Sequence, residues 1–534
     1  MTKRQKKWLI AVTLAIGFGL MALVIAAHVI ARRIDPYIRE QAILYLQRRF
    51  DSEAELASLR IRLPNTSAMK LLLSRGRGAL VRVEGDGVVL RHKGRHDVPP
   101  MFVMKNFTCE VDLGTLFDSP KTVRSVSISG MEINIPPKGD RPDLSGHDDD
   151  AAMDTGVIVQ DVMITASVLS ILPKDRNKSP LRFDLHQIRL QSVGKDVAMD
   201  YDAALTNAKP PGEILSKGKF GPWAAREPGD TPLAGNYAFD DADLGVFSGI
   251  AGILDSTGQF SGTLSSIEVQ GQASVPDFRL KKSGNRVPLK TRFEVQVDGT
   301  NGNTVLKPVN GTLGTTNFST SGAIIKREAD VARGISLDVT MPKGNLRDLL
   351  SLAMKGSPFM EGQIFLKTKI DIPPLTGKVR EKLVLDGQFD ISEAKFLRSK
   401  IQSRIDELSR RGRGQPENQE IDEVVHGMGG TFQLQNELMT FKGLSFAVPG
   451  AGVDLTGTYN LDNEELDFHG ALKLQAKVSQ TMSGWKRWLL KPVDPFFSKN
   501  GAGTFLRIQV HGTAKDPQFG REREKHERQA ERNP

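Results

Sequence analysis

Apolar and polar residues alternate along most of this chain, a pattern typical of β-strands that bury one face. Val81 and Val83 show this spacing, and so do Val126 and Ile128. The alternation is plainest in residues 430–476, in successive short runs separated by turns. It recurs in segments 156–172, 181–193, 197–205, 258–280, 289–299, 362–372 and 383–391. The pattern predicts a mainly β protein whose antiparallel strands each have one apolar and one polar face.

Helical periodicity is confined to a few short segments. Candidates are residues 242–254, 345–355 and 396–410, the last of which ends before Gly412 and Gly414. The sequence therefore predicts few short helices beside a large sheet.

One apolar run is long enough to cross a membrane. Residues 8–31 contain no Lys, Arg, Asp or Glu, and at about 1.5 Å per residue a helix of this length spans a ~30 Å hydrocarbon core. Lys3, Arg4, Lys6 and Lys7 precede it, so the positive-inside rule places the N-terminus in the cytoplasm. A cleaved signal peptide is the alternative, although its apolar region is normally shorter. We expect a single-pass anchor, with residues 1–7 as a cytoplasmic stub.

An amphipathic helix is expected directly after the anchor. Pro36 suits a first helical turn, and Ile34, Ile38, Tyr45 and Phe50 fall near one face. This helix opens an N-terminal helix and β region, residues 32–135.

Composition divides the rest of the chain. Residues 136–155 combine Pro and Gly with an Asp run and lack apolar periodicity, which indicates a polar linker. A central β region follows at 156–395, then a helix and loop at 396–420 and a C-terminal β region at 421–520. Residues 521–534 are charged and lack aliphatic side chains, so we expect a disordered tail.

The distribution of charge argues against a nucleic-acid partner. The net charge is +9, and residues 1–50 carry +7 of it around the apolar run. A nucleic-acid binder would instead gather basic side chains over a folded face with interleaved aromatic residues. The basic residues are therefore assigned to a membrane surface.

An internal repeat suggests which side chains face a ligand. Residues 262–278 and 503–519 agree at eight of seventeen positions without gaps, although chance likeness between two strand-turn segments is an alternative. Within the repeat, period two separates Glu268 and Gln509 from an apolar set on the other face. The candidate ligand-facing residues are Ile267, Val269, Ala273, Val275, Ile508, Val510 and Ala514.

A second candidate surface lies near the C-terminus, where two of the four tryptophans stand beside basic residues. Aromatic rings next to cations suit a lipid headgroup region, and burial in a core is the alternative. The candidate membrane-contact residues are Trp485, Trp488, Leu489, Phe496 and Phe497.

Signatures of catalysis are missing from the sequence. It contains no HExxH, GxSxG, phosphate-loop or CxxC motif, and Cys109 is the single cysteine. His92 and His96 have a spacing that would permit a metal pair, but a solvated hairpin explains them more simply. We expect no enzymatic activity, no cofactor and no metal.

Several phrases together resemble the AsmA-like family of envelope proteins. They are IDPYIREQAILYLQRRF from Ile34, VRSVSISGMEINIPP from Val123, TPLAGNYAFDDADLGVFSGIAGILDSTGQFSG from Thr231, and a closing stretch that contains FAVPGAGVDLTGTYNLDNEELDFHGALKLQA, KPVDPFF and VHGTAKDPQF. The resemblance implies an anchor in the bacterial inner membrane, a periplasmic bulk, and an elongated, twisted antiparallel β-sheet groove. It also implies phospholipid traffic between membranes and a role in outer-membrane biogenesis, and it carries over no catalytic residues.

Two functions of different classes follow. An apolar sheet face must be covered by another sheet, by helices, by closure or by a ligand. In the first hypothesis phospholipid covers it, and the chain is a lipid conduit that makes and breaks no bond. In the second, the chain is a periplasmic assembly factor that holds outer-membrane or other envelope proteins by strand pairing. Ordinary filled β-sandwiches are the structural alternative.

Overall fold

A computed structural model describes residues 39–521, except 41, 45, 48–51, 63–73, 75–76, 93, 118–120, 138–156, 174–177, 195, 225–226, 328–329, 331, 398, 418–425, 482–502 and 514–515. The predicted anchor at 8–31 and residues 522–534 of the predicted tail lie outside these residues, whereas Arg521, predicted to begin the disordered tail, is the last residue of a strand. Within the described part, no helix is both long and apolar enough to cross a membrane. The chain divides into two compact units, Met1–Ala238 and Phe239–Pro534. The division falls inside the predicted central region 156–395.

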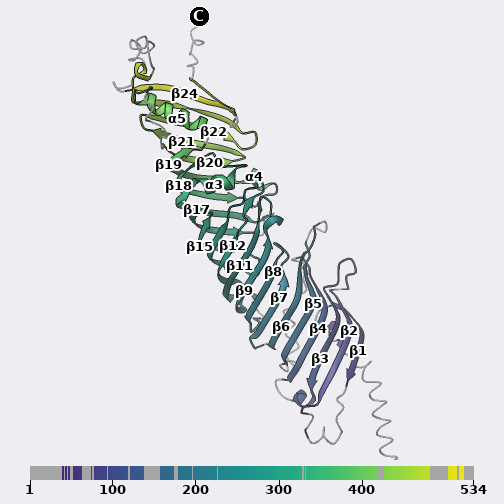
Figure 1. Ribbon diagram of the computed structural model, residues 1–534. Helices are drawn as coiled ribbons and strands as arrows, with labels where there is room; N and C mark the ends of the chain where they lie inside the picture. The colour runs from purple at the N-terminus through teal and green to yellow at the C-terminus, as the bar shows by residue number, and fades with distance from the viewer. Residues whose placement is uncertain are drawn as a thin grey trace, which may run out of the picture. The chain divides into compact units, whose positions relative to one another are not determined.

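Unit 1 (residues 1–238) is a twisted ladder of strands that pair in chain order (Figure 1). Its strands are β1 (Ser52–Arg62), β2 (Leu80–His92), β3 (Phe102–Asp112), β4 (Lys121–Ile135), β5 (Val157–Ile171), β6 (Leu181–Val193), β7 (Met199–Thr206) and β8 (Glu213–Phe220). Short 3-10 helices are η1 (Leu113–Phe117) and η3 (Pro228–Asp230). The strand β9 (Pro232–Asp243) contains the boundary between the units.

The pair β4–β5 departs from the predicted antiparallel order. These strands run parallel, with Val126 opposite Val162 and Ile133 opposite Leu169. A parallel pair needs a connection of a dozen residues or more, and the polar segment predicted as a linker joins these two strands. The alternation of side chains predicts the strands but not their direction, because only the connection decides between parallel and antiparallel pairing.

Unit 2 (residues 239–534) is a longer ladder that is antiparallel throughout its registered pairs. Its strands again pair in chain order (Figure 1). They are β11 (Ile253–Thr263), β12 (Ser266–Val275), β14 (Leu289–Val297), β15 (Thr304–Leu313), β16 (Thr316–Ile325), β17 (Gly334–Asn345), β18 (Met360–Ile372), β19 (Val384–Phe396), β20 (His426–Gln435), β21 (Leu438–Val448), β22 (Ala451–Asn460), β23 (Glu465–Leu474), β24 (Thr504–Thr513) and β25 (Pro517–Arg521). A separate two-stranded piece pairs β10 (Ile250–Ala251) with β13 (Arg279–Leu280).

Helices in unit 2 are short, and two of the three predicted ones are confirmed. These are α3 (Leu346–Ala353), where the Asn345 side chain accepts a 3.0 Å hydrogen bond from the Arg347 N–H, and α5 (Ser399–Gly412). The others are α4 (Val379–Lys382), η4 (Leu244–Val246) and η5 (Val478–Thr481). The predicted helix at 242–254 is wrong, because Gly249 and Gly252 have φ of +95° and +140° and end any helix there.

The buried core is divided into small clusters where helices meet strands. In unit 1, Ala42, Ile43 and Leu46 pack on Leu56 and Leu90, and they belong to the helical residues 39–40, 42–44 and 46–47. In unit 2, α3 covers a cluster with Ile364 and Ile391, and Ile405 and Leu408 of α5 pack on Val448 and Ala451. Among the described residues, the sheet outside the two ladders is the two-stranded piece β10–β13.

Candidate functional site

Each ladder separates apolar from polar side chains onto opposite faces. Residues directly opposite each other on paired strands project to the same side, so the register traces continuous rows of side chains across the sheet. These rows show whether the alternation predicted from sequence is kept in phase from strand to strand.

In unit 1, two apolar rows cross at least six strands. One row is Leu59, Gly85, Phe107, Ile128, Ile164, Ile188 and Ala203, and the other is Val83, Cys109, Val126, Val162, Leu190 and Tyr201. The opposite face is charged, with ion pairs Arg82–Glu110 at 2.6 Å and Arg189–Asp161 at 2.7 Å. The face without charges is the candidate binding surface of this unit.

The apolar face of unit 1 is hollowed by a cavity of about 660 Å³. Its wall includes Leu90, Phe102, Phe107 and Ile128, and Leu46 of the helical residues borders it. Asn134 is the one polar residue in its wall. A cavity with this lining suits hydrocarbon, since an apolar wall offers water almost no hydrogen-bond partners.

In unit 2, one apolar row crosses twelve strands from β11 to β23. It is Phe260, Val269, Val295, Leu306, Gly322, Leu337, Ile370, Leu385, Leu434, Met439, Tyr459 and Leu466. Leu434 is buried and the other side chains of the row are half-buried. Helix α3 covers a row three side-chain positions away that contains Ile364 and Ile391, and α5 packs on Val448 and Ala451. The two helices therefore cover the apolar face along one margin, and the face beside this margin is partly open.

The structure places most of the predicted groove residues on this face. Ile267, Val269 and Ala273 lie on it half-buried, and so do Ile508 and Val510, eleven strand steps away. Val275 is on the same side but only 2% exposed, so it belongs to a local core and is not available to a ligand. Ala514 and the five predicted membrane-contact residues, Trp485, Trp488, Leu489, Phe496 and Phe497, lie outside the described residues.

The two copies of the sequence repeat do not occupy equivalent positions. The first begins in a hairpin, with Gly262 at the end of β11, whereas in the second the strand β24 begins directly after Gly503. Both copies nevertheless keep their Ile and Val on the apolar face, and Glu268 and Gln509 on the other.

Aromatic rings laid over glycines were not anticipated from the sequence. Gly85 stands opposite Phe107, Gly387 opposite Phe432 and Gly457 opposite Phe468. A Cβ at Gly85 would lie 2.2 Å from the Phe107 ring, so the ring occupies the space of the missing side chain. The available signal was glycine in strand interiors, which often marks a close approach.

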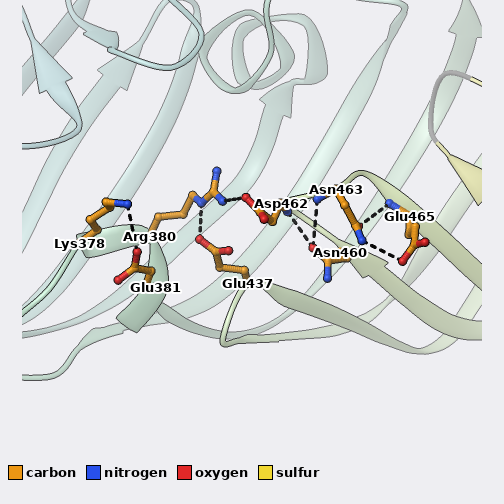
Figure 2. Close-up of polar contacts among 8 residues, drawn as sticks. All are labelled: Lys378, Arg380, Glu381, Glu437, Asn460, Asp462, Asn463 and Glu465. Atoms are coloured by element: carbon orange, nitrogen blue, oxygen red, sulfur yellow. Dashed lines mark hydrogen bonds and ion pairs between the residues drawn. The ribbon is translucent and has the colours of Figure 1, made fainter.

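Three connections at one edge of unit 2 are joined by a charged contact that we call the Arg380 strap, made of Arg380, Glu437 and Asp462 (Figure 2). Arg380 of α4 donates to Glu437 in the β20–β21 turn and to Asp462 in the β22–β23 turn. The hydrogen bond from Arg380 lowers the pKa of the Glu437 carboxyl, and the two carboxylates raise the pKa of the guanidinium. The strap therefore fixes neighbouring hairpin ends beside the apolar face.

The described residues offer little for bond-making chemistry. No group of three or more His, Cys, Asp or Glu among them could hold a metal ion. His96 Nε2 lies 3.1 Å from Glu53 Oε2, an exposed pair. Burial raises the pKa of the Cys109 thiol, which disfavours the nucleophilic thiolate. In comparisons with known proteins, no family model matches the chain, and no curated protein or solved structure is significantly similar to it.

Proposed function

We propose that this chain binds phospholipid and conducts it along its apolar sheet faces, as a non-enzymatic envelope protein of the AsmA-like type. In this proposal residues 8–31 anchor it in a bacterial inner membrane, the bulk is periplasmic, and the lipid traffic supports outer-membrane biogenesis. Acyl chains lie on the apolar face while headgroups remain in solvent.

The observation that carries the proposal is the unbroken apolar row from Phe260 to Leu466 with half-buried side chains. Leaving such a row in water is unfavourable. Burying 300 Å² of acyl chain against it contributes roughly 7.5 kcal/mol at about 25 cal/mol per Å², before the cost of association. The attraction has no preferred direction, so a bound chain can slide.

Cys109 provides a direct test, because it is the single cysteine and stands opposite Val126, which lines the cavity of unit 1. Full-length protein in detergent is labelled with a maleimide before and after reconstitution with phosphatidylglycerol. Bound lipid should slow labelling at least fivefold. In the control, Cys109→Ser with Thr108→Cys, the thiol projects to the charged face and lipid should not protect it. Equal labelling of Cys109 with and without lipid would count against the proposal.

The assembly-factor alternative rests on the end of the unit 2 ladder. The short strand β25 pairs with β24 over five residues, and within the described residues no strand covers its outer edge. An open edge can accept a strand from another protein. Native mass spectrometry of detergent-extracted protein separates the two functions, since co-purified phospholipid supports the conduit and co-purified polypeptide supports the assembly factor.

A further inference from the structure

The polar face of unit 2 is also hollowed. A cavity of about 950 Å³ extends over β11, β12, β14, β15 and β16. Its lining includes a row of directly paired residues, Thr257, Gln272, Arg292 and Asn310. On β12, Gln272 of this row projects to the face opposite that of the apolar Val269. Lys290 and Asn317 lie on the adjacent polar row. This basin, hereafter the polar basin, lies on the side of the sheet opposite the proposed lipid surface.

The charge of the polar basin differs from that of the surrounding polar face. Nearby, Lys307 is neutralised by Glu268 at 2.7 Å and Glu294 at 2.6 Å. Lys290 and Arg292 are exposed and make no ion pair with any described residue. Asp255 borders the basin, and its Oδ1 accepts a 3.0 Å hydrogen bond from the Asp241 N–H. The polar basin thus places two cations, neither of which has an acidic partner among the described residues, beside hydroxyl and amide groups.

A second hollow continues along the same face. It has a volume of about 520 Å³ over β17–β21, and its lining includes the paired row Lys367, Gln388, Thr431 and Lys442. Lys369 and two carboxylates, Asp338 and Asp386, also line it. Nine strand steps separate β11 from β21, which corresponds to about 43 Å at roughly 4.8 Å per step. A ligand that fills both hollows is therefore an extended chain.

The residues that line the hollows indicate the chemical class of this extended ligand. Phe318 borders the polar basin, but its ring lies over Gly311 on the apolar face, so no aromatic ring is offered to the stacked bases of a single-stranded nucleic acid. The basin also lacks the apolar pockets that anchor a peptide. Amides and hydroxyls instead match sugar hydroxyls, and unpaired cations match carboxylate or phosphate groups.

We propose that the polar basin and its continuation bind an anionic glycan, a sugar chain bearing carboxylate or phosphate groups. The site is independent of the lipid surface, because the two lie on opposite faces of one sheet. A glycan bound there would hold the ladder against a carbohydrate matrix while the apolar face remains available.

The test measures binding of an oligogalacturonate octamer to the full chain in a polyoxyethylene detergent by isothermal titration calorimetry. We expect saturable binding that weakens with salt, and at least tenfold weaker binding to Lys290→Gln/Arg292→Gln. Lys326→Gln removes an exposed cation outside the basin and should bind as wild type does. Asn310→Ala should weaken binding threefold or more without changing the salt dependence.

Several outcomes would overturn the assignment. They are an absence of wild-type binding, a double variant that binds normally while keeping the wild-type melting temperature, equal affinity for polyacrylate of the same charge, and tighter binding of an oligothymidylate. Ile267→Asp, on the opposite face, should leave glycan affinity unchanged, so a failure of the lipid proposal would not affect this result.

Discussion

Single glycines shape the apolar face at the residue scale. Where glycine stands opposite phenylalanine on the next strand, as with Gly85 and Phe107, the ring occupies the space that the glycine leaves empty. The ring then forms part of the cavity wall. The size of Phe107 and the absence of a side chain at Gly85 act together, so neither residue alone signals the arrangement.

The variant Gly85→Val tests this packing of a ring against a glycine. The ring of Phe107 is the neighbour that a Cβ at Gly85 meets, so Val should turn the ring into the cavity of unit 1 while leaving the strand intact. We expect phospholipid retained by the purified protein to fall at least threefold, with little change in circular dichroism. Gly85→Val/Phe107→Ala should recover lipid. Unchanged lipid content in Gly85→Val would contradict the expectation.

Acid should weaken unit 1 through a charged pair on its polar face. Glu110 accepts hydrogen bonds from Arg82, at 2.6 Å from Nη2 and 3.1 Å from Nε, and these lower the pKa of its carboxyl. A carboxyl with a lowered folded-state pKa stabilises the fold above its unfolded value of about 4.3, and the stabilisation is lost as pH falls through the folded value. In urea titrations, wild type and Arg82→Gln should differ at pH 7 and converge at pH 3. A difference that is constant over this range would rule out the pair as its cause.

At the scale of elements, alternation predicts strands well. The predicted segment 181–193 is β6, and the predicted segment 156–172 differs from β5 by one residue at each end. Two features were not predictable. The direction of β5 depends on a connection without a local signal, and the segment 242–254 has helical spacing that its positive-φ glycines override. Of the candidate site, the alternation predicts which side chains share a face, whereas the burial of Val275 depends on distant residues.

The Arg380 strap joins α4 to two turns that are themselves linked by a 2.8 Å backbone hydrogen bond from the Leu461 N–H to the Glu437 carbonyl. Arg380→Gln should free the β20–β21 and β22–β23 turns, because each loses a charged hydrogen bond. We expect faster amide hydrogen exchange confined to residues 435–438 and 460–465. Lys378→Gln breaks only the 3.4 Å contact with Glu381 and is the matched control. Exchange that rises equally in both variants would show that the strap does not restrain the turns.

At the scale of the whole chain, each unit has its own apolar face. In unit 2 the thirteen steps from β11 to β25 correspond to about 62 Å. The distribution of charge and the alternation of apolar and polar residues predict such a surface from the sequence. The sequence does not show what covers it, since a sandwich and an open trough require the same alternation.

Ile267→Asp distinguishes a ligand-covered face from a filled core. Ile267 is half-buried opposite Val297, so the carboxylate can stay hydrated and the cost to folding should be about 1–2 kcal/mol. We expect at least a threefold loss of co-purified phospholipid, measured by native mass spectrometry. Gln270→Asp places the same group on the opposite face three residues along the strand and should retain lipid. A folded Ile267→Asp protein with wild-type lipid content would exclude this part of the face from binding.

Pairing in chain order makes each ladder quasi-one-dimensional, because almost every strand contacts only the strands before and after it in the sequence. In such an array, stability is a sum of local terms and nearest-neighbour terms. Insertion of a hairpin that continues the apolar rows would lengthen the trough by about 10 Å without altering distant contacts. Evolution can therefore adjust the length of the surface to a required distance by duplicating or deleting pairs of strands.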